Sequence, residues 1–256
     1  TETTVTIPTQ GATSPTSYPN MSLFWADEFT GSELSDNYWS HETGNGSNGW
    51  GNNELQFYRP QNTSIKDGHL IITAKKEPFG GKEYTSSRIV TKVKKEFRYG
   101  RVDIRAALPK GQGIWPALWM LGSNFNTVSW PACGEIDIME MVGGSGRENT
   151  VHGTVHWQNE GKHAQFGGKT TLPSGTFSEK FAVYSIIWDA TSIRWLVDNK
   201  QYHVIDTTPA ELDEFRRSFF FVFNVAVGGN WPGSPNSSTT FPQHLIVDYV
   251  RVFQAN

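Results

Sequence analysis

The stretch GEIDIMEMVG, residues 134–143, places three carboxylates in a run of otherwise apolar residues. A lone carboxylate is costly to bury unless it is paired, hydrogen-bonded or open to a cleft. A helix would turn Glu135, Asp137 and Glu140 to roughly 0°, 200° and 140° about its axis, so they would share no face. In a strand the first two acids share a face, while Glu140 falls on the other face with the isoleucines.

One extra residue in that strand would restore a common face for all three acids. A β-bulge at Ile138 and Met139 lets two residues oppose one on the neighbouring strand, which returns Glu140 to the face of the other two acids. Bulges are enriched next to active sites. The pattern therefore predicts a bulged strand that carries three acids along a cleft.

Paired carboxyl groups of this kind are typical of glycosidases. A retaining enzyme needs its two carboxyl groups about 5 to 5.5 Å apart, and an inverting enzyme needs a wider gap for water. The Cα atoms of the two outer acids would lie on the order of 13 Å apart, and side chains that lean together would close most of that distance. The spacing permits retention and leaves inversion open.

A third carboxylate between the outer two would raise the pKa of a neighbour by charge repulsion, as a general acid requires. The pattern also leaves two other interpretations open. The acids could form a solvated strand face, or they could bind a hard cation, for which carboxylate oxygens are suitable ligands.

Composition narrows the classes of partner. The chain has 256 residues, of which 37% are hydrophobic, and one domain is the default expectation. The sequence contains no run of about 18 apolar residues, so no transmembrane segment is predicted. A net charge of -3 provides no broad basic field, so we expect neither nucleic acid nor a membrane as a partner. A monomer is the simplest expectation for the oligomeric state.

Residues 1–20 are rich in Thr, Ser and Pro and have no apolar periodicity, which is typical of a linker remnant left after a signal or another module was removed. This indicates secretion, with an extracellular, periplasmic or cell-surface location. Residues 21–256 are then a single catalytic domain. The single cysteine, Cys133, excludes an intrachain disulfide and is expected to be a buried, inert thiol.

Alternating apolar and polar residues predict many short strands, separated by turn signals such as DG at 67–68. One helix is predicted in TPAELDEFRR, residues 208–217, with Thr208 as N-cap, Pro209 at the first helical position and Glu211 completing a capping box. Many strands and one short helix predict an all-β sandwich or barrel. The clearest predicted strands are 69–75, 87–94, 100–108, 184–189, 192–198, 219–229 and 245–253.

Ten tryptophans exceed what one core needs, and several stand beside Gly or Asn. Examples are NGWGNNELQFY at 48–58, GIWPALWMLG at 113–122 and VGGNWPG at 227–233. Some of them are expected in the core. Sugar rings present apolar faces and equatorial hydroxyls, so a sugar cleft combines flat aromatic rings with polar side chains. The clustered tryptophans therefore predict a carbohydrate as the substrate.

The motifs together resemble one known family. DGHLIITA, YGRVDIRAALPKGQGIWPALWMLG, WPACGEIDIMEMVG, VHGTVH, FNVAVGGNWPG and VDYVRVF are similar to segments of the laminarinases, the endo-β-1,3-glucanases of glycoside hydrolase family 16. The likeness spans roughly residues 23–253. It implies a β-sandwich jelly roll of two curved antiparallel sheets with a concave substrate cleft. It also implies retaining double displacement with no catalytic cofactor.

The resemblance assigns roles to individual residues. It implies that Glu135 is the nucleophile, that Glu140 is the acid/base, and that Asp137 hydrogen-bonds and tunes the nucleophile. Trp115 and Trp119 match positions that shape the sugar site around the cleaved bond. Further hydrogen-bonding or stacking positions implied in the cleft are Asn53, Arg88, His156, Asn224 and Trp231.

Two metal sites are conceivable. The resemblance implies a structural calcium on the convex side, held by backbone carbonyls at Glu28 and Gly68 and by Asp248, which would stabilise the fold without entering the chemistry. The alternative is that Asp248 only joins a surface network. His152 and His156 share a strand face by parity, a spacing that also suits a metal, although no third ligand is evident.

The expected substrate is β-1,3-glucan, with mixed-linkage β-1,3-1,4-glucan as a second substrate. The rival within the enzyme class is an agar- or carrageenan-type galactan hydrolase. Sulfated galactans would call for Arg or Lys along the cleft, and the segments quoted above are mainly aromatic and neutral. The rival from another class is a non-catalytic β-glucan recognition module, which would be expected to lack one or both catalytic glutamates.

Overall fold

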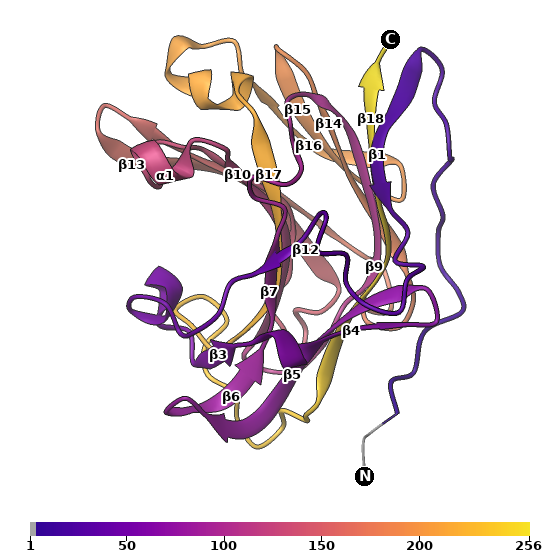
Figure 1. The fold of residues 1–256 in the computed structure, drawn as a ribbon, viewed down its shortest axis with the longest axis vertical. Helices are drawn as coiled ribbons and strands as arrows, with labels where there is room; N and C mark the ends of the chain where they lie inside the picture. Colours follow the sequence, from indigo (N-terminus) through magenta and orange to yellow (C-terminus); the bar gives the residue numbers. More distant parts are fainter. Residues whose placement is uncertain (1–3) are drawn as a thin grey trace.

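The structure is a computed structural model that describes residues 4–256. Two sheets pack face to face, and all strand pairs in them are antiparallel except β3 with β6 (Figure 1). This confirms the all-β jelly-roll prediction. The ten-stranded outer sheet contains, in spatial order, β16 (Lys200–Asp206), β15 (Ser192–Val197), β14 (Ala182–Trp188), β9 (Gly100–Ala107), β18 (Gln243–Ala255), β5 (His69–Phe79), β6 (Lys82–Ser86) and β3 (Gln56–Tyr58), with β1 (Met21–Asp27) on β18 and β4 (Thr63–Lys66) on β5.

The eight-stranded inner sheet is curved (Figure 1), and the face that points away from the outer sheet lines a cleft. The strands that carry the three acids and their neighbours lie at its centre. In spatial order it contains β13 (Lys162–Thr171), β12 (Thr150–Asn159), β11 (Glu135–Glu140), β10 (Ile114–Gly122), β17 (Phe219–Val227), β7 (Arg88–Val90) and β2 (Ser40–His41), with β8 (Glu96–Phe97) on β17.

The core lies between the two sheets and follows from the two-residue period of a strand. On β10 and β17 of the inner sheet, Leu118 and Phe221 are fully buried, and they belong to the same apolar cluster as Ile104 and Val250 of the outer sheet. Burying each such side chain stabilises the fold by about 1.5 to 3 kcal/mol. The alternate residues of the inner strands are thereby turned toward the cleft.

All seven predicted strands are present, with ends that shift by a few residues. The largest difference is the segment 87–94, where the strand β7 is only Arg88–Val90. The chain turns directly afterwards, because Val93 has a left-handed backbone with φ 68° and the amide of Lys94 bonds the carbonyl of Thr91. A strand cannot continue through such a turn.

The predicted helix and its cap are wrong in detail. The segment forms a 3₁₀ helix, η3 (Ala210–Arg216), and the Thr208 hydroxyl donates to Asp206 rather than capping it. Among residues 4–256, no helix is long and apolar enough to span a membrane. The other short helices are η1 (Gly49–Asn53), η2 (Pro60–Asn62) and α1 (Phe125–Val128).

The described part of the predicted linker, residues 4–20, runs along the outer sheet (Figure 1). The Arg105 guanidinium donates to the Ala12 carbonyl over 2.6 Å, and the Tyr18 hydroxyl donates to Asp103 over 2.6 Å. The side chain of Ile7 packs against a small buried cluster of the same sheet. These contacts fix the segment to the domain, in contrast to a free linker.

Candidate active site

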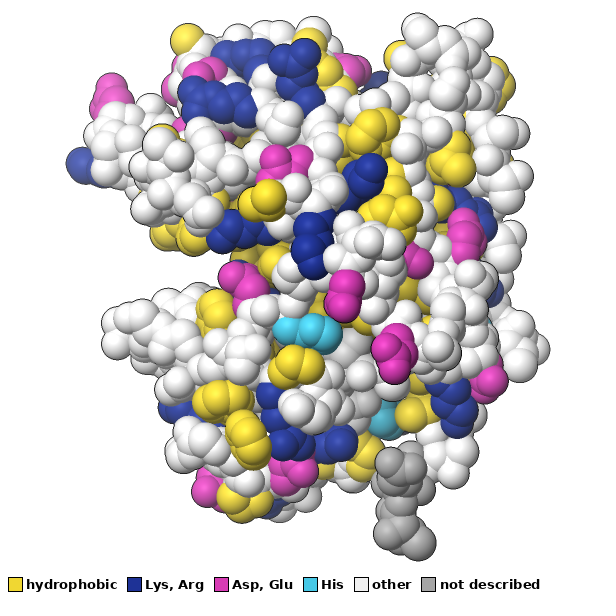
Figure 2. All heavy atoms as spheres, viewed as in Figure 1, with side chains coloured by type: hydrophobic (Ala, Val, Ile, Leu, Met, Phe, Trp, Pro, Cys, Tyr) yellow, Lys and Arg dark blue, Asp and Glu magenta, His cyan; other side chains and the backbone are white. Residues whose placement is uncertain are grey.

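A cleft of about 1160 Å³ crosses the hollow face of the inner sheet. Figure 2 shows it as a deep notch at the left edge of the molecule. Side chains from β7, β10, β11, β12 and β17 line its floor, and the loops around η1, α1 and residue 231 supply its walls. Half of the ten tryptophans line the cleft: Trp50, Trp115, Trp119, Trp130 and Trp231.

The predicted bulge is present in β11. Trp119 of β10 pairs with Asp137, but the preceding Leu118 pairs with Met139, so the residue between these two partners is extra. The register of β11 with β12 shifts at the same place. The two apolar residues of the bulge are buried in the core, and Glu140 lines the cleft with the other acids. The parity problem posed by the sequence is solved in this way.

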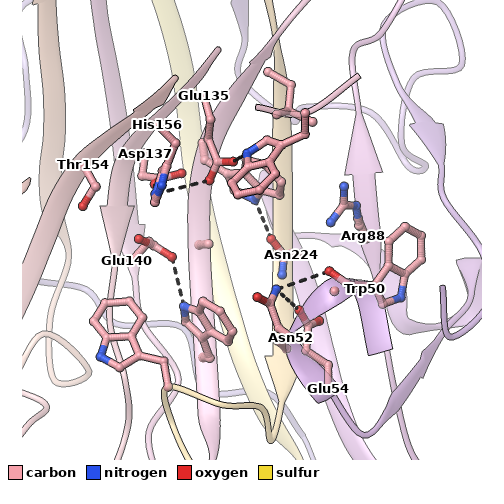
Figure 3. A pocket seen from close by; sticks show the side chains of 18 of the residues that line it. Trp50, Asn52, Glu54, Arg88, Glu135, Asp137, Glu140, Thr154, His156 and Asn224 are labelled. Carbon is pink, nitrogen blue, oxygen red and sulfur yellow. Dashed lines mark hydrogen bonds and ion pairs between the residues drawn. The ribbon is translucent and has the colours of Figure 1, made fainter. Parts of the chain in front are cut away.

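Each outer acid accepts a hydrogen bond from a tryptophan (Figure 3). The Nε1 atom of Trp130 donates to Oε2 of Glu135 over 2.7 Å. The Nε1 atom of Trp115 donates to Oε1 of Glu140 over 3.1 Å. An indole N–H can only donate, so each contact favours the ionised carboxylate and fixes one of its oxygens.

Asp137 lies between the outer acids and is almost fully buried. Its Oδ2 atom is 3.1 Å from Nε2 of His156, which is also 3.9 Å from Oε1 of Glu135. The other ring nitrogen of His156 is 2.9 Å from Nε2 of His163. The strand β12 thus supplies a histidine beside the central acid. This histidine, His156, sits opposite Glu135 in the ladder.

The three acids raise one another's pKa values. Burial, followed by the charge of Asp137, holds the pKa of Glu135 well above its usual range, and the Trp130 hydrogen bond partly opposes this. Burial and the charge of Glu140 likewise raise the pKa of Asp137. Burial and the charge of Glu135 raise the pKa of Glu140 to about 8. The group therefore retains a proton near neutral pH, as an acid catalyst requires.

A chain of hydrogen bonds runs from the cleft floor into its wall. The Trp119 indole N–H donates to Asn224 over 2.7 Å, the Asn224 amide donates to the Tyr58 hydroxyl over 3.0 Å, and that hydroxyl donates to Glu54 over 3.2 Å. Every donor points the same way, toward the Glu54 carboxylate. Burial nevertheless raises the pKa of Glu54, while its hydrogen bonds with Asn52 and Gln56 lower it.

Arg88 stands beside this chain. Its guanidinium lies over the rings of Trp50 and Trp119, 4.5 and 4.9 Å from their centroids, and its Nε atom donates to Glu42 over 2.9 Å. Arg stacks on aromatic faces in this way because its guanidinium is planar and weakly hydrated. The arrangement fixes two tryptophan rings on one side of the cleft.

The remaining predicted sugar contacts divide into two groups. Trp231 lines the cleft and packs edge-on against Trp115 and His152. Asn53 is exposed, does not line the cleft and donates to Asn230. Its neighbour Asn52 lines the cleft instead and donates to Glu54 over 2.9 Å.

Sequence reasoning did not single out several cleft residues, which are Glu42, Trp50, Glu54, Trp130 and His163. Three of them stood inside or beside quoted motifs. A glutamate between two amides in NNELQ and a tryptophan five residues before Glu135 were signals that could have indicated them. Cys133 is buried as predicted, and burial raises the pKa of its thiol to about 11.

Two of the residues predicted for calcium have side chains that pair with cationic groups. The Asp248 carboxylate accepts from Arg105 over 2.7 Å and lies 3.5 Å from His69. The Glu28 side chain pairs with Arg251 over 2.7 Å. One oxygen of the carboxylate that calcium would need is thus already paired with a guanidinium, and the calcium site stays a prediction.

A β-sandwich whose concave sheet carries paired carboxylates among tryptophans is typical of the glycoside hydrolases. A sequence profile of the glycosyl hydrolases family 16 matches residues 51–251. The chain belongs to that family.

Similar solved structures and similar characterised proteins support this family membership. The laminarinase catalytic domain from Thermotoga maritima MSB8 is 45% identical, covers 93% of this chain and 99% of its own, and superposes with a TM-score of 0.87. A "Beta-glucanase" of Rhodothermus marinus is 43% identical over 92% of this chain and 86% of its own length. The clotting factor G alpha subunit of Tachypleus tridentatus is 40% identical over 92% of this chain, which spans only 34% of that protein.

Proposed function

We propose that this chain is an endo-acting retaining glycoside hydrolase that cleaves β-1,3-glucan. The observation that carries the proposal is the bulged strand, which turns Glu135 and Glu140 into one cleft with Asp137 between them. The solved relative from Thermotoga maritima is described as a laminarinase, and the Rhodothermus relative as a beta-glucanase. Both descriptions support a β-glucan as the substrate.

The reaction runs in two steps. In the first, Glu140 protonates the glycosidic oxygen while Glu135 attacks the anomeric carbon, which gives a covalent glycosyl-enzyme. In the second, Glu140 removes a proton from water, which attacks the same carbon and releases Glu135. The Trp115 and Trp130 hydrogen bonds hold the two carboxylates in place through both steps.

Asp137 has a supporting role in this mechanism. It transfers no proton to the leaving group in the proposed steps, and its charge raises the pKa of Glu135. Because Asp137 lies next to the nucleophile, the two carboxyl groups can share one proton. When Glu135 is released as a carboxylate, the protonated Asp137 can donate a hydrogen bond to it. The chemistry uses only carboxyl groups of this chain.

The cleft lining favours a neutral glucan over a sulfated galactan. Two cations line it, of which Arg88 is paired with Glu42, while Lys92 lies over the ring of Phe125. A sulfated polymer would call for unpaired Arg or Lys at several subsites. The exposed notch in Figure 2 suits attack within a long chain.

We further propose mixed-linkage β-1,3-1,4-glucan as a second substrate and a location outside the cytoplasm. The relevant substrates are polysaccharides, which are too large to cross a membrane unaided.

Product analysis tests the function. The protein is incubated with laminarin, lichenan, agarose and carrageenan, and products are followed by chromatography and anomeric NMR. We expect mixed oligosaccharides from laminarin, with the β-anomer first. Activity on a galactan alone would show that the substrate is a galactan and not a β-1,3-glucan. Initial α-anomers would show that the mechanism is inverting. Binding of laminarin without cleavage would place the chain with recognition modules.

The nucleophile is tested by Glu135→Ser. This variant should lose turnover by several orders of magnitude and still bind laminari-oligosaccharides, because the rest of the cleft is unchanged. Glu160→Ser, at an exposed turn, is the matched control and should keep full activity. Undiminished hydrolysis by Glu135→Ser would refute the assignment.

A further inference from the structure

We propose that the cleft contains an inhibitory site for zinc, formed by Glu135, Asp137 and His156. One ligand atom from each of these residues lies within 4.8 Å of the others. Two come from β11 and one from the neighbouring β12, so the strand ladder sets their separation. The site does not depend on which polysaccharide the cleft binds.

The distances fit a tetrahedral metal. With metal–ligand bonds of about 2.0 to 2.2 Å, two ligands of a tetrahedral zinc lie about 3.3 to 3.5 Å apart. Nε2 of His156 is 3.1 Å from Oδ2 of Asp137 and 3.9 Å from Oε1 of Glu135. Shifts of a few tenths of an ångström would bring both pairs to that separation.

A buried oxygen in the cluster has no hydrogen bond. Oδ2 of Asp137 is inaccessible to solvent and accepts no hydrogen bond from residues 4–256, although His156 comes within 3.1 Å of it. A buried carboxylate oxygen without a donor is costly, and a cation bound to it would remove that cost. This observation is independent of the clustering of the acids.

His163 is the hydrogen-bond partner that holds the metal ligand His156 in place. Its Nε2 atom lies 2.9 Å from Nδ1 of His156, and the two rings stack with centroids 5.1 Å apart. A histidine that binds metal usually donates its other ring N–H to a neighbouring acceptor, which fixes its tautomer and orientation. The contact with His163 leaves Nε2 of His156 free to bind the ion.

The mixed ligand set selects the metal. Imidazole nitrogen with two carboxylate oxygens suits zinc, whereas calcium and magnesium prefer oxygen alone. Zinc bound to Glu135 would occupy the oxygen that attacks the anomeric carbon. Inhibition should therefore be competitive with the glucan and reversed by a chelator.

Calorimetry tests the site without relying on activity. Zinc chloride is titrated into metal-free protein, and we expect one site per chain. His156→Gln should abolish it, and His163→Gln should weaken it by about ten- to a hundredfold, the usual effect of losing an outer partner of a metal ligand. His244→Gln, on β18 of the outer sheet, is the control and should bind zinc as the wild type does.

Cobalt provides a second readout. Co²⁺ in a tetrahedral site absorbs visible light strongly, so wild type should show this band and His156→Gln should not. Circular dichroism checks that each variant is folded. Equal zinc affinity in wild type and folded His156→Gln, absence of a stoichiometric site in the wild type, or zinc inhibition that is not competitive would each overturn the proposal. Loss of glucan hydrolysis alone would affect only the proposed function.

Discussion

The indole N–H of Trp115 donates a hydrogen bond to Glu140, the carboxyl that we assign as acid/base, over 3.1 Å. The donor stabilises the ionised form and so opposes the burial and the Glu135 charge that raise the pKa of Glu140 to about 8. In Trp115→Phe the pKa of Glu140 should rise by about one unit, since a hydrogen bond to a charged group is worth about 1.5 kcal/mol or more.

The alkaline limb of the kcat/KM profile should then move to higher pH, because the acid stays protonated for longer. Initial rates on laminarin between pH 4 and 10 would measure it. Trp119→Phe is the matched control, since Trp119 lines the same cleft but donates to Asn224. An equal shift in both variants would show that the limb does not report the Trp115 contact.

The hydrogen bond from Trp130 to Glu135 predicts a shift in the acidic limb of the kcat/KM profile. Its N–H lowers the pKa of the nucleophile, so Trp130→Phe should raise that pKa. Glu135 would then ionise only at higher pH, and the acidic limb of kcat/KM should move upward by about half to one unit. Trp231→Phe serves as comparison, because Trp231 lines the same cleft but makes ring contacts with Trp115 and His152 rather than a hydrogen bond to Glu135. An unmoved acidic limb in Trp130→Phe would contradict the prediction.

Removing the catalytic acid should stabilise the protein at alkaline pH. A carboxyl whose folded-state pKa is raised, from an ordinary 4.5 to about 8 for Glu140, contributes stability below the lower value that is lost as pH rises to the higher one. Glu140→Gln should therefore match wild type near pH 4 and exceed its free energy of unfolding at pH 9 by on the order of 2 kcal/mol.

Denaturant unfolding across that range measures the difference. Glu160→Gln, at an exposed turn, is the control and should show no pH-dependent gain. A Glu140→Gln variant that is less stable than wild type at pH 9 would mean that the carboxylate is better solvated or better paired than its position in the cleft indicates.

The pairing of Asp248 with Arg105 bears on the calcium prediction. Because a guanidinium 2.7 Å away already neutralises the carboxylate, thermal melts in calcium and in EDTA should coincide. Asp248→Asn should lower the free energy of unfolding by about 1 to 3 kcal/mol, since Arg105 is nearly buried. Glu28→Gln should cost less than about 1 kcal/mol, because the Glu28 carboxylate that pairs with Arg251 is exposed. A melting temperature that rises with calcium would restore the predicted site.

The alternating strands predicted the fold class, and the acid stretch predicted the centre of the site, because the parity of a strand leaves few ways to place three carboxylates together. The bulge followed from Glu140 alone and is confirmed in two ladders. The linker prediction missed the packing of residues 4–20, since single contacts such as Ile7 and Tyr18 leave no periodic pattern. The helix predicted at 208–217 forms as a 3₁₀ helix that starts later, with Pro209 rather than Thr208 at the N-cap, and the Thr208 hydroxyl donates to Asp206.

The walls of the site were harder to predict than its floor. Glu54 and Asn224 are linked through Tyr58, and their positions are 170 residues apart in the sequence. No local pattern indicates such a contact, since β3 and β17 belong to different sheets and meet where the Leu55 amide donates to the Val227 carbonyl. His163, by contrast, is only seven residues from His156 in the sequence and reaches it across a hairpin turn.

The hydrogen-bond chain through Tyr58 predicts a coupled loss of stability and substrate binding. In Tyr58→Phe the Asn224 amide loses its acceptor and Glu54 loses a donor, both of them buried. The free energy of unfolding should fall by about 1 to 3 kcal/mol. KM for laminarin should rise several-fold, because Trp119 depends on Asn224 for its orientation.

Tyr38→Phe is the matched control for the loss of one hydroxyl, since Tyr38 packs against Trp25 away from the cleft. Denaturant unfolding and initial rates on laminarin would be compared for both variants. The Tyr58 variant should lose stability and gain KM, while the Tyr38 variant should change neither by much. If both lose the same stability and keep the wild-type KM, the chain to Glu54 does not position Trp119, and its donors only satisfy buried groups.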